Sequence, residues 1–307
     1  MKVPRSGVLH PYADGLIAFE HCSCLPSPSP SQNILILIGG LFDGLGTIPY
    51  AESISDALPS TWSLAQPILT SSYKGWGMTC LQQDVKELSK CVAYFRSLKK
   101  GKIVLMGSST GCQDVMEYLT GSGSEARGPI EGAIMQAPVS DREAITMHLD
   151  PKIYTQSCLA AQSQMDAGLG EEVLSLHPDI TQFFPCPISA RRWLSLASPN
   201  KDGDDDYFSS DLTTEQLTST FGVLPARTPL CVLISGADEY IPKNIDKNRL
   251  LKRWITVIQN GQGKIDLQNS GILDGATHNL ENNAPEIVSN FVSRVMSFLS
   301  NLDNSLV

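Results

Sequence analysis

Apolar runs of strand length recur along this chain, with segments of helical periodicity between them. The run Asn33–Ile38 is apolar from its second residue onward, which is typical of a strand buried on both faces of a parallel sheet. Two shorter segments, residues 7–10 and Leu16–His21, flank Ala13-Asp14-Gly15 and predict a β-hairpin. Further runs predict strands over residues 63–69, 103–106, 132–139, 230–235 and 265–272.

Residues Leu81–Leu98 give the clearest helical pattern. Apolar side chains recur at three- and four-residue intervals, acidic residues lie in the first half, and two lysines follow the end, in agreement with the helix dipole. Further helices are predicted over residues 48–58, 112–119 and 286–299. Strands that alternate with helices indicate an α/β fold with a mostly parallel, doubly wound sheet.

Residues 141–227 interrupt this alternation. The segment holds several helix-like pieces, prolines and a charged loop, and it is too long for a plain crossover between strands. We therefore expect a helical cap, inserted between late strands, over the carboxyl ends of the sheet, where α/β folds bind ligands. The predicted organisation is a core of residues 1–140 and 228–307 with a cap or lid of residues 141–227. The proline-rich run 25–31 is expected to form a stiff loop.

Composition narrows the class of protein. The chain has 307 residues, 42% of them hydrophobic and 18% charged, and its net charge of −9 argues against nucleic acid and anionic membrane surfaces as partners. The N-terminus lacks the apolar core of a secretory signal, and no apolar run reaches transmembrane length. Eight cysteines without an export signal indicate free thiols in a reducing compartment, so a cytoplasmic location is expected. Cys22 and Cys24 are too closely spaced for a zinc knuckle, and Cys112 is expected to be buried.

The motif that carries chemistry is GSSTG, residues 107–111, between the predicted strand 103–106 and the predicted helix 112–119. A G-x-S-x-G pattern in this context is typical of a nucleophile elbow. The turn is so tight that both outer positions require glycine, and the central serine adopts a strained backbone conformation. This predicts Ser109 as the nucleophile. The alternative interpretation is a glycine- and serine-rich turn that merely enters a helix.

A serine hydroxyl needs a general base, and the base needs an orienting acid. In elbow enzymes these follow the serine in the order acid, then histidine. Asp238 follows the strand 230–235 and is the predicted acid, with Glu239 beside it and Asp141, after the strand 132–139, as the alternative. His278 lies between the last predicted strand and the last helix and is the predicted base.

The tetrahedral intermediate of such a reaction carries an oxyanion, which needs two N–H donors. Thr110 is expected to supply one. The glycine-rich loop 39–44 is expected to supply the other, from Leu41 or alternatively from Phe42. A phosphate cradle is a weaker interpretation of this region, because Pro49 occupies a glycine position of the dinucleotide fingerprint and no Walker lysine is present. No organic cofactor and no metal ion are expected.

The acidic loop DGDDD, residues 202–206, resembles a calcium site only superficially, because it lacks the ligand spacing and terminal glutamate of an EF-hand. We expect a solvated loop before a helix capped by Thr213 with Gln216. A sharper hypothesis is that its negative charge attracts a cationic substrate toward the cap.

Across nearly its whole length the chain resembles the α/β-hydrolase superfamily and, more narrowly, the DUF1749 family of fungal and plant hydrolases. Gly39 stands where many relatives in the superfamily carry histidine. The matching segments are residues 39–45 (GGLFDGL), 71–77 (SSYKGWG), 107–114 (GSSTGCQD), 136–143 (QAPVSDRE), 205–211 (DDYFSSD) and 236–240 (GADEY).

The resemblance implies a serine esterase that hydrolyses ester bonds of a hydroxamate siderophore of the fusarinine C type, inside the cell, to release iron. Its partner is then a small-molecule ester, and any iron arrives with that substrate. Phe42, Tyr73 and Trp76, which lie in matching segments, are expected to contact the substrate. Two alternatives remain: a general carboxylesterase or lactonase with the same residues, and a receptor that keeps the fold without turnover. The sequence predicts no oligomeric state.

Overall fold

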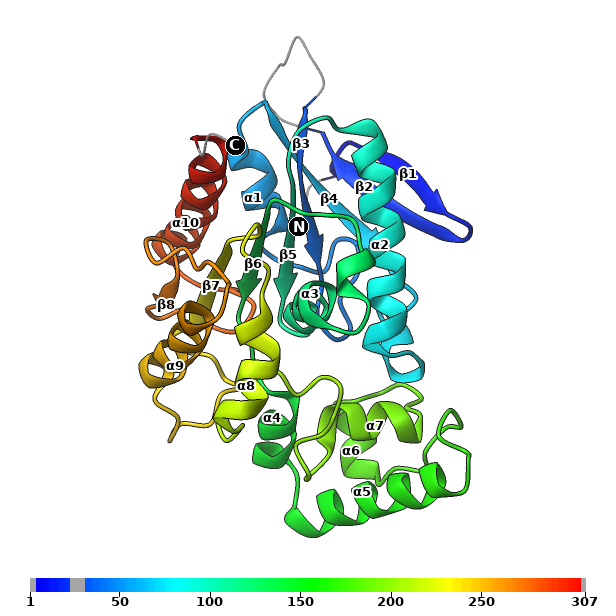
Figure 1. Ribbon diagram of the computed structural model, residues 1–307. Coiled ribbons are helices and arrows are strands. Elements are labelled where there is room, and N and C mark those ends of the chain that lie inside the picture. The colour runs from blue at the N-terminus through cyan, green and yellow to red at the C-terminus, as the bar shows by residue number, and fades with distance from the viewer. Residues whose placement is uncertain (1–3, 23–30, 305–307) are drawn as a thin grey trace.

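The computed structural model describes residues 4–22 and 31–304 and consists of one sheet with helices on both faces (Figure 1). Cys24 and all but the last residue of the proline-rich run 25–31 lie outside the described residues. Within them the strands are β1 (Gly7–Ala13), β2 (Leu16–His21), β3 (Asn33–Ile38), β4 (Trp62–Ile68), β5 (Ile103–Ser108), β6 (Gly132–Gln136), β7 (Leu230–Ser235) and β8 (Gly271–Leu273).

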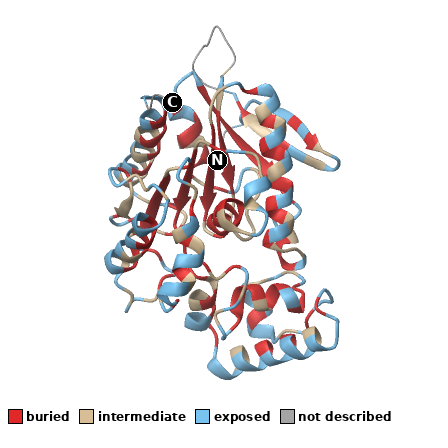
Figure 2. Ribbon diagram, viewed as in Figure 1, coloured by how far each residue is buried: buried red, intermediate tan, exposed pale blue. Residues whose placement is uncertain are grey.

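The spatial order of the strands is β1-β2-β4-β3-β5-β6-β7-β8. The hairpin of β1 and β2 is antiparallel and joins β4 in antiparallel fashion, whereas every pairing from β4 to β8 is parallel. Strands β3, β5, β6 and β7 are buried at nearly every position (Figure 2), as continuous apolar runs require. The predicted fold class, a mostly parallel doubly wound sheet, is confirmed.

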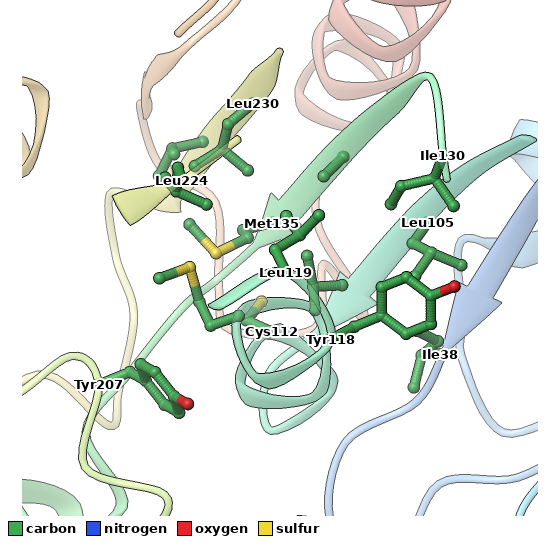
Figure 3. Packing of buried hydrophobic residues seen from close by; sticks show 14 of the residues in the cluster. Ile38, Leu105, Cys112, Tyr118, Leu119, Ile130, Met135, Tyr207, Leu224 and Leu230 are labelled. Carbon is green, nitrogen blue, oxygen red and sulfur yellow. The ribbon is translucent and has the colours of Figure 1, made fainter. Parts of the chain in front are cut away.

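Two hydrophobic clusters cover the two faces of this sheet. On one face lie α1 (Ala51–Ala57) and α10 (Pro285–Asn304). On the other lie α2 (Leu81–Leu98), α3 (Gly111–Thr120), α8 (Thr214–Thr220) and α9 (Lys247–Asn260). Figure 3 shows α3 against the sheet, with Cys112 and Leu119 turned toward Met135 of β6. Cys112 is fully buried, as predicted.

The remaining helices gather at the carboxyl ends of the strands, in the lower part of Figure 1. They are α4 (Asp141–His148), α5 (Pro151–Asp166), α6 (Pro178–Phe183) and α7 (Ala190–Ala197), and they share a third hydrophobic cluster centred on Trp193. The later part of residues 141–227 behaves differently, because Phe208 and Phe221 pack on Trp254 of α9 within a main core cluster. Helices over the strand ends thus span residues 141–197, and the remainder covers the sheet.

Two predicted strands differ from those observed. The strand predicted over residues 132–139 ends at Gln136 because Ala137 adopts a positive φ of 49°. The strand predicted over residues 265–272 is reduced to β8, and Ile265 forms only an isolated bridge with Leu230. Between them, Asp266 accepts hydrogen bonds from the backbone amides of Gln268 and Asn269, and this local turn competes with strand pairing.

Candidate active site

Ser109 lies at the sharp turn between β5 and α3. Its φ is 54°, a left-handed value that is uncommon for a residue with a side chain. The outer glycines are required by contact: a Cβ on Gly107 would lie 2.2 Å from the carbonyl oxygen of Gly111, and one on Gly111 would lie 2.5 Å from that of Ile38. The elbow geometry expected from the sequence is therefore present, and it projects the serine beyond the end of β5.

The structure brings Ser109, His278 and Asp238 together although they are far apart in sequence. The distance from His278 Nε2 to Ser109 Oγ is 2.8 Å. On the other side of the ring, His278 Nδ1 lies 2.9 Å from Asp238 Oδ2 and 3.0 Å from Asp238 Oδ1. The Asp238 side chain is fully buried and the His278 side chain is 10% exposed. This arrangement fits proton transfer from the hydroxyl to an imidazole oriented by a carboxylate.

Three further residues fix His278, and sequence reasoning did not identify their roles. Gln136 Nε2 donates to the carbonyl oxygen of His278 at 2.7 Å, and Glu239 Oε2 accepts from the amide of His278 at 2.9 Å. The ring of Tyr240 meets the imidazole edge to face, with centroids 4.7 Å apart. The sequence signal for Gln136 is a polar residue at the end of an otherwise apolar strand, since buried polar groups need partners.

Gln136 also ties neighbouring elements together. Its Oε1 accepts from Tyr50 Oη at 2.8 Å and from Ser108 Oγ at 3.1 Å. The amide side chain thus connects the elbow, the segment before α1 and the histidine loop. These hydrogen bonds of Gln136 hold the backbone of His278 at a fixed distance from the end of the sheet.

The glycine-rich loop 39–44 is folded around Asp43. The amide of Gly40 donates to Asp43 Oδ2 at 3.0 Å, and the amide of Asp43 donates to the carbonyl oxygen of Gly40 at the same distance. Phe42 has a positive φ of 66°. Among the described residues, the backbone amides of Leu41, Phe42 and Thr110 have no hydrogen-bond partner. Either Leu41 or Phe42 can therefore act with Thr110 as a donor to an oxyanion.

A pocket of about 320 Å³ opens over Ser109 between the strand ends and α4. Its lining includes the Ser109–His278 pair and further residues with polar groups: Asp43, Ser108, Thr110, Asp141, His148, Glu239, Tyr240 and Asn279. The rest of the lining is apolar and comes from the loop 39–44, from α4 and the residues beside it, and from the end of α6: Leu41, Phe42, Val139, Ala144, Ile145, Leu149, Phe183 and Phe184. Such a site suits an ester with an apolar portion and a few hydrogen-bonding groups.

Asp141, the alternative acid, also lies in this pocket but does not contact His278. Its Oδ2 accepts from Gln113 Nε2 at 2.7 Å. Burial, with a contribution from the charge of Asp205, raises the pKa of Asp141 to about 7. The geometry thus favours Asp238 over Asp141 as the partner of the imidazole.

The three predicted substrate contacts fall in different places. Phe42 lines the pocket. Trp76 does not, because its indole is buried between the rings of Phe42 and Phe184, at centroid distances of 5.3 Å and 5.4 Å. Tyr73 also lies away from the pocket, with its hydroxyl donating to the carbonyl oxygen of Leu45 at 3.3 Å. The structure therefore brings only Phe42 to the substrate side.

The acidic loop 202–206 is less solvated than expected. Asp205 is buried and accepts from Arg192 Nη1 at 2.6 Å, and Asp206 accepts from Arg142 Nε at 2.8 Å. Two of its four charges are therefore matched by arginines, and none of the loop lines the pocket. The prediction of a solvated loop is wrong for these two residues, and the steering hypothesis loses its main support. The capping box of Thr213 with Gln216 is present as predicted.

The described residues offer neither a metal-binding cluster nor a membrane-spanning helix. Residues 4–22 and 31–304 contain no group of three or more His, Cys, Asp or Glu side chains placed to hold a metal ion. Within the same ranges, no helix combines the length and apolar character needed to cross a membrane.

The chain matches a family model described as "Protein of unknown function (DUF1749)" over residues 1–300. It is 38% identical to the fusarinine C esterase sidJ of Aspergillus fumigatus, with 96% of each chain covered. It is also 36% identical to the esterase AN6793 of Emericella nidulans, over 98% of this chain and 94% of that one.

Among solved structures, the siderophore hydrolase EstB from Aspergillus fumigatus superposes with a TM-score of 0.85, at 38% identity and with 99% of each chain covered. A monoglyceride lipase from Saccharomyces cerevisiae shares the fold at a TM-score of 0.60 and 12% identity. The coverage of the family model and the level of identity leave the assignment plain: this chain belongs to the DUF1749 family and has the α/β-hydrolase fold.

Proposed function

We propose that this protein is a serine esterase that hydrolyses ester bonds of a hydroxamate siderophore of the fusarinine C type. The observation that carries the proposal is the 2.8 Å contact between Ser109 Oγ and His278 Nε2, at the base of a pocket, in a chain whose relatives are named as siderophore-ester hydrolases.

In the proposed mechanism, Ser109 Oγ attacks the ester carbonyl carbon while His278 Nε2 takes the hydroxyl proton. Asp238 holds the imidazole in orientation and stabilises its charged form. The carbonyl oxygen becomes an oxyanion that accepts from the amides of Thr110 and of Leu41 or Phe42, and each such donor typically contributes about 3 kcal/mol. His278 then protonates the departing alcohol. In the second step His278 takes a proton from water, the water oxygen attacks the acyl carbonyl carbon, and His278 returns the proton to Ser109 Oγ as the acid product leaves.

We propose that the reaction takes place in the cytoplasm and assists iron release after uptake of a ferric siderophore. The seven cysteines within the described residues are all free thiols, which supports a reducing compartment. We further propose that the cap lies within residues 141–227 and is formed by α4 to α7, because α4 and the end of α6 supply one wall of the pocket.

A panel of substrates tests this function: ferric and iron-free hydroxamate triesters, simple aryl esters and small lactones. We expect the highest kcat/KM for the hydroxamate esters, with cleavage fragments identified by mass spectrometry. Fast turnover of aryl esters or lactones with none of the hydroxamates would instead support a general carboxylesterase or lactonase, which the largely apolar pocket of about 320 Å³ also suits. Binding of a hydroxamate ester without cleavage would support a receptor.

A further inference from the structure

A second, smaller cavity lies behind the proposed oxyanion hole. Its volume is about 30 Å³. Leu41, Asp43 and Thr110 line both this cavity and the pocket over Ser109, so they form the partition between them. The walls away from the pocket include Trp76, Asp84 and Asp114, which lie in the short helical turn Gly75–Met78, in α2 and in α3.

The walls of this cavity carry polar atoms that the protein itself does not satisfy. Within the described residues, four buried atoms here have no hydrogen-bond partner: Trp76 Nε1, Asp84 Oδ1, Thr110 Oγ1 and Asp114 Oδ1. An unpaired buried polar group is unfavourable. Four such atoms around one cavity therefore indicate a shared hydrogen-bond partner inside it. The cavity exceeds the roughly 10–15 Å³ that one water molecule requires. It therefore has the room and the groups to bind water that bridges Thr110 to the two aspartates.

The charges around the cavity are unbalanced. The guanidinium of Arg192 is committed to Asp205, at 2.6 Å, and to the carbonyl oxygen of Trp76, at 3.0 Å. Among the described residues, Asp84 and Asp114 form no ion pair. Arg192 lines the same cavity, so its one charge faces three carboxyl groups, those of Asp205, Asp84 and Asp114. A buried carboxylate without a directly paired cation is costly and tends to retain its proton.

The other acids around this pair accept hydrogen bonds from nearby groups. Asp43, in the partition, accepts from the Gly40 amide at 3.0 Å and from the Thr47 hydroxyl at 2.6 Å. Glu87, on α2, accepts from the amide and hydroxyl of Thr70, and Glu117, on α3, accepts from the Tyr207 hydroxyl.

Burial raises the pKa of Asp84 to about 7. The charge of Arg192 and a hydrogen bond with Ser71 oppose this rise, and like charge from Glu87 and Asp205 adds to it. Burial, followed by the charges of Asp84 and Asp205, also raises the pKa of Asp114 well above its usual range.

We propose that Asp84 and Asp114 are positioning residues for the oxyanion hole: they retain at least one proton between them and, through water in the cavity, brace Thr110 and Leu41 from behind. This inference rests on the proposed esterase function. Its physical reason is that the intermediate places negative charge against the Thr110 amide. Two ionised carboxylates just behind that amide would oppose the charge, whereas a protonated pair does not.

An infrared measurement tests proton retention without any substrate. The C=O stretch of a buried protonated carboxyl is resolved from that of carboxylates and shifts in heavy water. We expect this band in the wild-type protein at neutral pH, and we expect it to weaken in Asp84→Asn/Asp114→Asn and to persist in the control Glu131→Gln. Glu131 pairs with Arg96 at the opposite end of the sheet. Absence of the band in the wild type, or an unchanged band in the asparagine pair, overturns the proposal whether or not the protein cleaves esters.

Kinetics test the positioning role. We expect kcat of the wild type to fall by about threefold to tenfold as pH rises above neutrality, with KM little changed, and the asparagine pair, which cannot ionise, to lose that decline. Asp84→Ala/Asp114→Ala, which loses the hydrogen bonds, should have lower kcat at every pH. Equal kcat values and pH profiles in all three proteins, with a phosphonate probe still labelling Ser109, would leave the esterase function intact and overturn this inference. A wild type without esterase activity would instead refute the proposed function.

Discussion

Ser109, His278 and Asp238 come from three separate loops, and each loop has its own anchor. The elbow is fixed by the close approach of Gly107 to Gly111, and the histidine loop is fixed by Gln136 and Glu239. The backbone of the acid loop is closed by a hydrogen bond of 3.0 Å from the Tyr240 amide to Asp238 Oδ1. Because separate residues hold the three loops, we expect substitutions of Ser109, His278 and Asp238 to change catalysis more than folding.

We expect Ser109→Ala and His278→Ala each to lower kcat by about ten-thousandfold or more, and the double variant to lose little beyond either single one, because such residues act as a unit. Steady-state kinetics on the best ester of the panel measure this. Additive losses in the double variant would show that the two side chains work independently.

Asp238→Asn should lower kcat by about ten-thousandfold, because the amide does not hold the required tautomer of the imidazole. Asp141→Asn, a matched change inside the same pocket, should cost less than about tenfold, because Asp141 contacts Gln113 and not His278. The reverse ranking would assign the acid role to Asp141.

The order of residues along the chain was enough to place the nucleophile, acid and base together, because an elbow fold dictates that order. It was not enough to find Gln136 or Glu239. Both bond to the backbone of His278. A polar residue at the end of an apolar strand signals that Gln136 has a buried partner, but which partner it has depends on how the loops pack. Tyr73 and Trp76 were expected at the substrate because they share a segment with matching residues, yet packing turns one outward and buries the other.

At the scale of elements, the glycine-rich loop and the elbow approach each other closely. A Cβ on Gly40 would lie 2.7 Å from Ser109 Cβ and 3.2 Å from Ser109 Oγ. We expect Gly40→Ala to lower kcat by at least about a hundredfold, since it displaces the nucleophile from the donors, with little change in the urea midpoint. An unaltered kcat would show that the loop 39–44 moves to accommodate the methyl group without displacing Ser109.

The cap helix α7 is joined to the acidic loop by the buried pair of Arg192 and Asp205. Asp205→Asn should lower the free energy of unfolding by about 3–5 kcal/mol, because it leaves a buried guanidinium without its partner. Asp204→Asn, on the exposed neighbour, should change it by less than about 0.5 kcal/mol. Urea denaturation of both variants measures the contrast, and similar values for the two would show that the pair contributes no net stability.

Strands in the middle of the sheet were predictable because full burial produces continuous apolar runs, as in Asn33–Ile38. The edge strand β8 was not, because its preceding residues favour a turn around Asp266 over pairing. The acidic loop was misjudged for a similar reason. Its arginine partners lie on α4 and α7, and their proximity depends on tertiary packing.

Several buried carboxyl groups make the stability of the whole molecule depend on pH in the same direction. The pKa values of Asp84 and Asp141 are each raised to about 7. Between the ordinary carboxyl pKa near 4 and about 7, the folded state therefore binds more protons than the unfolded state, so stability falls as pH rises through this window. Urea unfolding between about pH 4 and about pH 8 should show this decline, and Asp84→Asn/Asp114→Asn should flatten it. A rise in stability across the window would contradict the assigned protonation.

The central claim is that Ser109 cleaves hydroxamate siderophore esters through an acyl-enzyme. Acid quenching during turnover of a ferric hydroxamate triester, followed by intact-mass and peptide analysis, tests it most directly. We expect a mass increase equal to the acyl fragment, located on the peptide that contains Ser109 and absent from Ser109→Ala, which should also release no fragments. Continued cleavage of the triester by Ser109→Ala, or an acyl group on any other residue, would contradict it.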